Sequence, residues 1–434
     1  MLAPYFPPSG RVGAKRALRL ARRLAAIGWR MTILTLDLQS SARLSEFTDE
    51  TLLEGTEALN IVRVKAWLPG VPPIGLHGPT SRTEEGAIVA ARIRHLRGRV
   101  IREMCLPDPL IGWAPFVLPA ALKLVQQQRP HAIFAMARPF SSLVIGWLLS
   151  LRSGCSLILD YRDPWTSQTD PRSRPPLFRR PLERFLERAI ARRATHVFFA
   201  SPTRAQHYQD SICPSSPSKV SWLPNAIDEP HAHLTSQSAS GETPFILHAG
   251  NLYGGRTLIP VLNALQALER EALLEPRHLI VEVRGTLDRT TQAFLEVSPQ
   301  ARSYLRVEAP LSYTRIRPRM QMARALLIVV APEHSADIPA KIYDYLATER
   351  PILCLAPDNS EAGRLIRHLG AGIVVDPSDA RALREAILTI MGNTRGGILR
   401  EDRLSDFTVA SLANRVELVL EGLQMAQRAD HVPD

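Results

Sequence analysis

The sequence contains little cysteine, and its metal-ligating side chains are not grouped. Its four cysteines, Cys105, Cys155, Cys213 and Cys354, are far apart and form no metal or redox spacing. The 12 histidines are scattered as well, and none forms a metal-binding pair flanked by carboxylates. We therefore expect no metal, no other cofactor and a reduced, cytoplasmic setting.

Long apolar runs and several enzyme signatures are also missing. The longest apolar segment, Ser141–Leu151, has about half of the 18–20 residues of a membrane span, and the N-terminus shows no signal-peptide pattern. No G-x-S-x-G nucleophile context occurs, and no G-x-G-x-x-G follows a predicted strand. These absences argue against a serine hydrolase and a dinucleotide oxidoreductase.

Lysine is scarce, with 5 residues against 48 arginines, and the net charge of +11 is unevenly spread. Residues 1–230 contain 31 Lys and Arg against 18 Asp and Glu, whereas the remainder contains 22 against 24. A basic first half favours an anionic partner, and no nucleic-acid-binding signature accompanies the charge. We expect no nucleic acid but a peripheral contact with an anionic membrane surface, unless the arginine content only reflects genome composition. The candidate side chains are Arg92, Arg94, Arg97, Arg99 and Arg102.

Strand and helix patterns alternate through both halves of the 434 residues, which predicts two α/β domains with largely parallel sheets. We expect a first domain at 1–228, a linker at 229–243, a second domain at 244–404 and a terminal helix at 405–434 that returns to the first domain. Residues 1–3 leave little room for a first strand, so that this strand is short or the true start lies upstream. The helix Glu183–Arg193 is expected to pack through Phe185, Leu186 and Ile190.

The most informative segment is Cys155–Thr166, in which a buried strand runs into Asp160, Arg162, Asp163, Pro164 and Trp165. Charges at the end of a buried strand are costly unless they face a crevice, and ligands of open α/β sheets bind there. The alternative is a surface turn with a fortuitous ion pair. Near the N-terminus, Gly10 and Gly13 precede a helix and allow close approach of a ligand to the backbone.

The second half contains two further motifs. In His248–Arg256 a strand leads into a glycine-rich turn that contains Gly250, Asn251 and Arg256. In Asp337–Leu353 a helix begins near Pro339, where proline is tolerated, and Lys341 and Asp344 lie about one turn apart. An exposed helix pair is the alternative interpretation of the last two residues.

Together these motifs resemble bacterial members of the retaining glycosyltransferase family 4, through D-[YF]-R-D-P-W at Asp160–Trp165 and P-x-K-[IL]-x-[ED]-Y-L-A at Pro339–Ala347. The resemblance extends from Tyr5 to about Pro377. It implies the α/β GT-B fold, in which two Rossmann-like domains face each other across a cleft.

The resemblance also implies roles for individual residues. The basic and acidic residues that would act in catalysis are Arg162, Asp163, Arg256 and Lys341. The donor nucleotide sugar would be bound by Gly10, Gly13, Gly250, Asn251, Gly285, Pro310, Asp337, Pro339 and Asp344. Asp160 and Trp165 would lie on the acceptor side.

The implied function is transfer of a sugar from a nucleotide diphosphate to a hydroxyl acceptor, such as a sugar or a lipid-linked sugar, with retention. Two family positions differ here, because Ala336 replaces a glutamate and Asn251 replaces a basic residue. The alternatives are therefore a non-catalytic GT-B partner protein that binds an anionic lipid or another transferase, and a sugar 2-epimerase of the same architecture.

Overall fold

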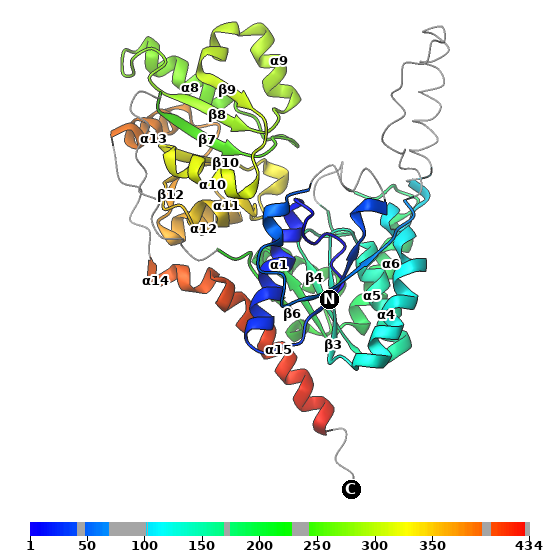
Figure 1. Cartoon of the computed structure of the whole chain (residues 1–434). Helices are drawn as coiled ribbons and strands as arrows, with labels where there is room; N and C mark the ends of the chain where they lie inside the picture. Colours follow the sequence, from blue (N-terminus) through cyan, green and yellow to red (C-terminus); the bar gives the residue numbers. More distant parts are fainter. Residues whose placement is uncertain are drawn as a thin grey trace, which may run out of the picture. The chain divides into compact units, whose positions relative to one another are not determined.

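The computed structural model describes residues 1–40, 48–68, 101, 103–168, 174–227, 243–392 and 401–429. The chain divides into two compact units, shown in Figure 1. Unit 1 contains residues 1–224 together with residues from Leu412 onward, and unit 2 contains residues 225–411. The boundary falls at Pro224, whereas residue 228 was expected. The expected linker lies outside the described residues, apart from residue 243. The five candidate arginines between Arg92 and Arg102 also lie outside them.

Unit 1 is built on parallel strands. Its strands are β1 Thr32–Leu36, β2 Asn60–Val64, β3 Ala132–Met136, β4 Ser156–Tyr161, β5 His196–Phe199 and β6 Val220–Trp222. Strands β3 to β6 pair in chain order, and β1 pairs with β2. Residues 1–3 bridge the two groups, because Leu2 forms parallel bridges with both Leu34 and Ala135. The short first strand therefore lies between β1 and β3.

The helices of unit 1 are α1 Val12–Ala26, α4 Ala114–Gln128, α5 Ser141–Ser153, α6 Arg180–Arg193, α7 Pro202–Ile212 and most of α15 Val409–Ala429. Helix α1 forms because apolar residues recur at helical spacing, and Ala17, Leu20 and Leu24 are almost fully buried. Glu417 of α15 accepts a hydrogen bond from the Trp29 indole at 3.1 Å. The terminal helix thus packs on unit 1.

One described helical stretch corrects the expectation that no segment reaches membrane-spanning length. Pro109–Gln128 has 20 residues and a mean hydropathy of 1.3, which is sufficient by length and composition alone. The helices of a protein core satisfy the same criterion. The apolar window of this stretch is 28% buried, with Trp113, Val117 and Ala121 in the core of unit 1.

Unit 2 has one six-stranded parallel sheet in the order β12-β11-β10-β7-β8-β9. This is the strand order of dinucleotide-binding folds, and it reverses between β7 and β10. The strands are β7 Phe245–Ala249, β8 Ile280–Arg284, β9 Leu305–Glu308, β10 Ala325–Val329, β11 Ile352–Leu355 and β12 Gly372–Val375. The helices are α8 Ile259–Arg270, α9 Arg289–Val297, α10 Tyr313–Met322, α11 Lys341–Leu346, α12 Glu361–Leu369, α13 Ala380–Gly392 and α14 Glu401–Leu404.

Candidate functional site

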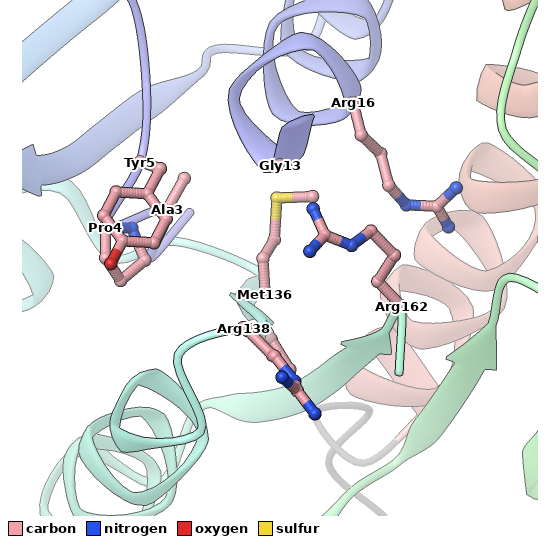
Figure 2. A pocket seen from close by; sticks show the side chains of 9 residues that line it. Ala3, Pro4, Tyr5, Gly13, Arg16, Met136, Arg138 and Arg162 are labelled. Carbon is pink, nitrogen blue, oxygen red and sulfur yellow. The ribbon is translucent and has the colours of Figure 1, made fainter. Parts of the chain in front are cut away.

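Unit 1 has a hollow where its strand order reverses, between the first strand and β3. The hollow is lined by Ala3, Pro4, Tyr5, Gly13, Arg16, Met136, Ala137, Arg138 and Arg162 (Figure 2). The residues come from the segments that follow the first strand, β3 and β4, and from the start of α1. Ligands of open α/β sheets bind at such reversal points. The sequence motif around Arg162 therefore lies where a ligand site is expected.

Three of the side chains that line the hollow are arginines, and each lies near a carboxylate. The Asp163 carboxylate lies 3.5 Å from a guanidinium nitrogen of both Arg138 and Arg162, and all three side chains are partly exposed. A Cβ on Gly13 would lie 3.1 Å from Arg162 Nη1, so the guanidinium lies against the first turn of α1. The first turn contains no acidic residue, and no side chain caps it. A guanidinium beside the positive end of a helix dipole is unfavourable until an anion binds between them.

Asp160 is bound by a buried arginine and does not face an open crevice. Both of its carboxylate oxygens accept hydrogen bonds from Arg16, at 2.8 and 2.7 Å, and both side chains are buried. Arg16 also donates to the carbonyl oxygens of Leu223 and Pro224. This bidentate pair joins α1, the end of β4 and the last residues of unit 1.

Trp165 is a core residue, which corrects the expectation that it lies on the acceptor side. Its side chain is 2% exposed and stacks on Phe140 with 5.4 Å between ring centroids. Its indole N–H donates to Glu183 at 2.6 Å. Because both the ring and the N–H are satisfied inside unit 1, the side chain does not reach the surface of the hollow.

Gly10, a predicted donor-binding residue, is exposed just before α1.

In unit 2, the glycine-rich turn follows β7 at the point where the strand order reverses. Gly250 has a φ of +116°, which a side chain would strain. A Cβ on Gly250 would also lie 3.3 Å from Lys341 Nζ, so the missing side chain lets the ammonium lie against the turn. The strand order therefore brings together two motifs that are about 90 residues apart.

Lys341 is hydrogen-bonded to a buried histidine, His248, that was not among the predicted site residues. His248 Nδ1 lies 3.0 Å from Leu327 O, and its Nε2 lies 3.0 Å from Lys341 Nζ. With the proton on Nδ1, the ring donates to the carbonyl and accepts from the ammonium. Burial, and then the charge of Lys341, lower the pKa of His248 well below its usual value, so the ring stays neutral. The only available signal in the sequence was a polar residue at the end of an otherwise apolar strand.

The ammonium of Lys341 lies in a partly buried and positive environment. Burial, followed by repulsion from Arg256, lowers the pKa of Lys341 to about 7, although Asp344 acts in the opposite direction. The guanidinium of Arg256 is stacked over the Tyr253 ring, 4.4 Å from its centroid. Two cations close together with limited hydration form a site for an anion such as a diphosphate.

The other predicted donor-side residues surround these cations or support the turn. Asn251 Oδ1 accepts from Thr286 N at 3.0 Å, and thereby joins the loops that follow β7 and β8. A Cβ on Gly285 would lie 2.4 Å from Gly250 O, so only glycine fits there. Asp337 pairs with His334 at 3.1 Å.

Three further predicted residues lie near the starts of two helices: Pro310 before α10, Pro339 before α11 and Asp344 within α11. Pro339 O accepts from Ile342 N and so begins α11, which is only six residues long. Tyr313 OH lies 3.5 Å from Asp344 Oδ1. Pro310 is exposed after β9, and nothing in the structure gives it a specific role.

Two residues at the hollow of unit 1 were not part of any motif found in the sequence. Arg138 lines the hollow of unit 1, and Arg16 binds Asp160. Among the described residues, no group of three or more His, Cys, Asp or Glu side chains could hold a metal ion.

Comparison with known proteins supports the same fold. Residues 13–226 match the glycosyl transferase 4-like domain. Similar solved structures include Anabaena HepE in complex with UDP-glucose, at 15% identity and a TM-score of 0.57, covering 97% of this chain and 98% of that one. Sucrose-phosphate synthase from Thermosynechococcus elongatus is 12% identical, with a TM-score of 0.55 and coverage of 95% and 91%.

The N-terminal domain of Candida albicans trehalose-6-phosphate phosphatase is also similar, at 12% identity and a TM-score of 0.56, with coverage of 97% and 92%. No curated protein sequence matches the chain significantly. At these identities the structural likeness shows the fold, and the predicted fold class is confirmed. Residues 13–226 thus resemble a glycosyl transferase 4-like domain, in a chain that has the α/β fold of the two-domain GT-B glycosyltransferases.

Proposed function

We propose that this protein is a glycosyltransferase that moves a sugar from a nucleotide diphosphate to a hydroxyl acceptor, with retention at the anomeric carbon. The observation that carries the proposal is a pair of cations at the glycine-rich turn of unit 2. Lys341 lies beside Gly250, and Arg256 is close enough to lower the pKa of Lys341. The match of residues 13–226 and the likeness to a structure named as a UDP-glucose complex support it.

In this mechanism the diphosphate of the donor lies against Lys341 and Arg256. Negative charge grows on the diphosphate as the bond to the sugar breaks, and fixed cations in a partly buried site stabilise that charge. We assign the ribose hydroxyls to Asp344, which lies one turn beyond Lys341. Because the protein supplies these cations, the mechanism needs no metal.

We assign the acceptor to the hollow of unit 1. Arg138 and Arg162 would bind a phosphate or sugar hydroxyl of the acceptor, and Asp163 would orient them. No residue is assigned as a nucleophile. We therefore propose a front-face reaction, in which a leaving diphosphate oxygen takes the proton of the acceptor hydroxyl as that hydroxyl attacks the anomeric carbon.

A non-catalytic role is the second candidate, because two family positions have changed. Ala336 stands where a glutamate is common, and the side chain of Asn251 is used to join two loops. The similar fungal domain, named as part of a phosphatase, shows that this fold alone does not establish sugar transfer.

The deciding experiment is a screen of UDP-, GDP- and dTDP-sugars for binding by calorimetry and for slow hydrolysis. An enzyme should bind one nucleotide class and release the sugar, with retained configuration detectable by NMR. Nucleotide binding without any turnover, even with mixed acceptors, would favour the non-catalytic role. Absence of binding to every nucleotide would contradict both the donor site and the proposed reaction.

Replacing Arg256 with alanine should lower turnover by roughly a hundredfold, which is the usual loss when one transition-state donor is removed. The Tm should hardly change, since the side chain is partly exposed. Steady-state kinetics and a thermal melt measure both effects, and Arg270→Ala on the exposed end of α8 is the control. Wild-type turnover in Arg256→Ala would remove this residue from the site.

Replacing Asp344 with alanine should weaken binding of the nucleoside diphosphate by about 1–3 kcal/mol, the cost of lost hydrogen bonds to a charged group. Calorimetry with the nucleotide found in the screen tests this, with Asp344→Asn as a control that keeps one acceptor oxygen. Unchanged affinity in Asp344→Ala would show that the ribose is bound elsewhere.

A further inference from the structure

Helix α6 of unit 1 packs Leu186, Ile190 and Ala191 in the core, but its first turns also bury two carboxylates and expose two large apolar side chains. Glu183 and Glu187 lie on its buried face, whereas Leu182 and Phe185 are 55% and 66% exposed. The expectation that Phe185 faces the core is therefore wrong. A soluble protein normally buries the apolar face of a surface helix, so this arrangement requires an explanation.

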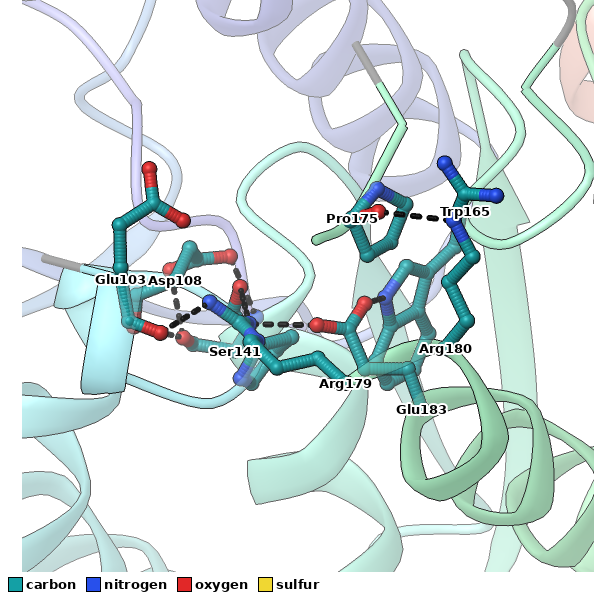
Figure 3. Close-up of polar contacts among 9 residues, drawn as sticks. Glu103, Asp108, Ser141, Trp165, Pro175, Arg179, Arg180 and Glu183 are labelled. Carbon is teal, nitrogen blue, oxygen red and sulfur yellow. Dashed lines mark hydrogen bonds and ion pairs between the residues drawn. The ribbon is translucent and has the colours of Figure 1, made fainter. Parts of the chain in front are cut away.

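The two inward carboxylates hold α6 in this orientation. Glu183 accepts from the Trp165 indole and pairs with Arg179 at 2.5 Å (Figure 3). Glu187 accepts from both the backbone N–H and the hydroxyl of Thr166. Burial raises the pKa of Glu187 to about 7. Rotating the helix to hide Phe185 would break these contacts.

Exposed apolar side chains gather at the start of α6, and we call this group the apolar ridge. Phe178, Leu182 and Phe185 are spaced by four and three residues and so follow one stripe. Arg179 donates to Glu103 O and Pro107 O, which brings residues 103–107 to the start of α6 (Figure 3). The ridge consists of side chains that are all at least 55% exposed: Met104, Leu177, Phe178, Leu182 and Phe185.

Every charged side chain that α6 exposes is basic. Both of its carboxylates face inward, so the outward charges are five arginines, three exposed and two partly exposed: Arg180, Arg184, Arg188, Arg192 and Arg193. The ridge is therefore flanked by positive charge that no acidic residue of the same helix neutralises.

This combination selects among possible partners. A second copy of the chain, joined through the same face, would place arginines against arginines. A bilayer with anionic lipids accepts both features, because Phe and Leu enter the boundary between headgroups and acyl chains while Arg binds the lipid phosphates. The ridge also projects from a helix that lies along the surface, as interfacial helices do.

We infer that the apolar ridge and the arginines of α6 form a docking surface for an anionic membrane. The start of α6 lies in the interface plane, and unit 1 is held at the bilayer without a spanning segment. This inference does not depend on the proposed sugar transfer, since it concerns binding alone.

The test is co-sedimentation of the full chain with vesicles of phosphatidylcholine, either alone or mixed with about one third phosphatidylglycerol. The wild type should bind the mixed vesicles and lose most of its binding when salt is raised from about 0.05 to 0.5 M. The double variant Leu182→Gln/Phe185→Gln should bind at least tenfold more weakly, and Arg184→Gln/Arg192→Gln should bind more weakly with less dependence on salt.

A matched control is Leu273→Gln/Val297→Gln, which changes two apolar residues of unit 2 that are at least 55% exposed, as the two ridge residues are. This variant should bind as the wild type does. All variants should keep their Tm, because the altered side chains are exposed. Three results would overturn the inference: no binding of the wild type to mixed vesicles, unchanged binding of the ridge variant, or a wild-type dimer in solution that only the ridge variant dissociates.

Discussion

Lys341→Met should lower turnover by roughly a hundred- to a thousandfold, while the Tm stays within a few degrees of the wild type. This expectation rests on the proposed function. Methionine keeps the length and apolar stem of lysine, so it fills the same space beside Gly250. The variant loses the positive charge, which is needed most when the diphosphate leaves. Stability should not suffer, because a partly buried ammonium whose pKa is lowered to about 7 already costs free energy at neutral pH.

Kinetics and a thermal melt check this prediction, and the two must be read together. A large loss of activity at unchanged Tm places Lys341 in the reaction. If Lys341→Met is inactive because it unfolds, it says nothing about the diphosphate. The second probe is then His248→Gln, because the amide oxygen of glutamine can still accept a hydrogen bond from Lys341. Full activity in Lys341→Met would contradict the assignment.

The pH dependence of nucleotide binding gives an independent check of the same residue. A diphosphate prefers protonated Lys341, so binding raises the pKa of this residue above the value of about 7 in the empty site. Affinity should therefore be constant below pH 7 and fall above it, by up to about tenfold per pH unit. The neutral His248 adds no transition in this range. Lys341→Met should show a flat profile from pH 7 to 9, and an unchanged slope in that variant would assign the titration to another group.

Much of the fold could be predicted because strong local patterns specify it. The apolar strands of unit 2, such as β10 at Ala325–Val329, are buried at every residue, and a continuous apolar run of this kind leaves a clear signal in the sequence. Strand β9, Leu305–Glu308, was not predicted, because none of its four residues is buried and charged residues interrupt its apolar ones.

The candidate site was predicted where strand ends carry unusual residues, and missed where the partner is distant in the sequence. Gly250 and Lys341 could each be selected from a local motif, but their contact depends on the order of the strands. Trp165 and Phe185 were placed wrongly for the same reason. Their positions depend on Glu183, whose burial beside an indole N–H and Arg179 cannot be seen in a helical periodicity.

The role of Asp160 follows from such a distant partner, and it leads to the largest expected effect on stability. Asp160→Ala should lower the free energy of unfolding by about 3–5 kcal/mol, because it leaves the guanidinium of Arg16 buried without its carboxylate. Arg16 also holds the carbonyl oxygens of Leu223 and Pro224, so the loss should loosen the last residues of unit 1. Denaturant unfolding measures the first effect, and hydrogen exchange near residue 224 measures the second.

A double-mutant cycle separates the structural role of Asp160 from the acceptor contact that its motif suggested. Arg16→Met/Asp160→Ala should lose clearly less stability than the sum of the two single variants, since removing both charges leaves neither of them buried alone. An acceptor contact would give the opposite pattern. Asp160→Ala would then unfold like the wild type but have a raised KM for the acceptor, and its effect would add to that of Arg16→Met. The buried bidentate geometry, with both carboxylate oxygens bound to Arg16, supports the first outcome.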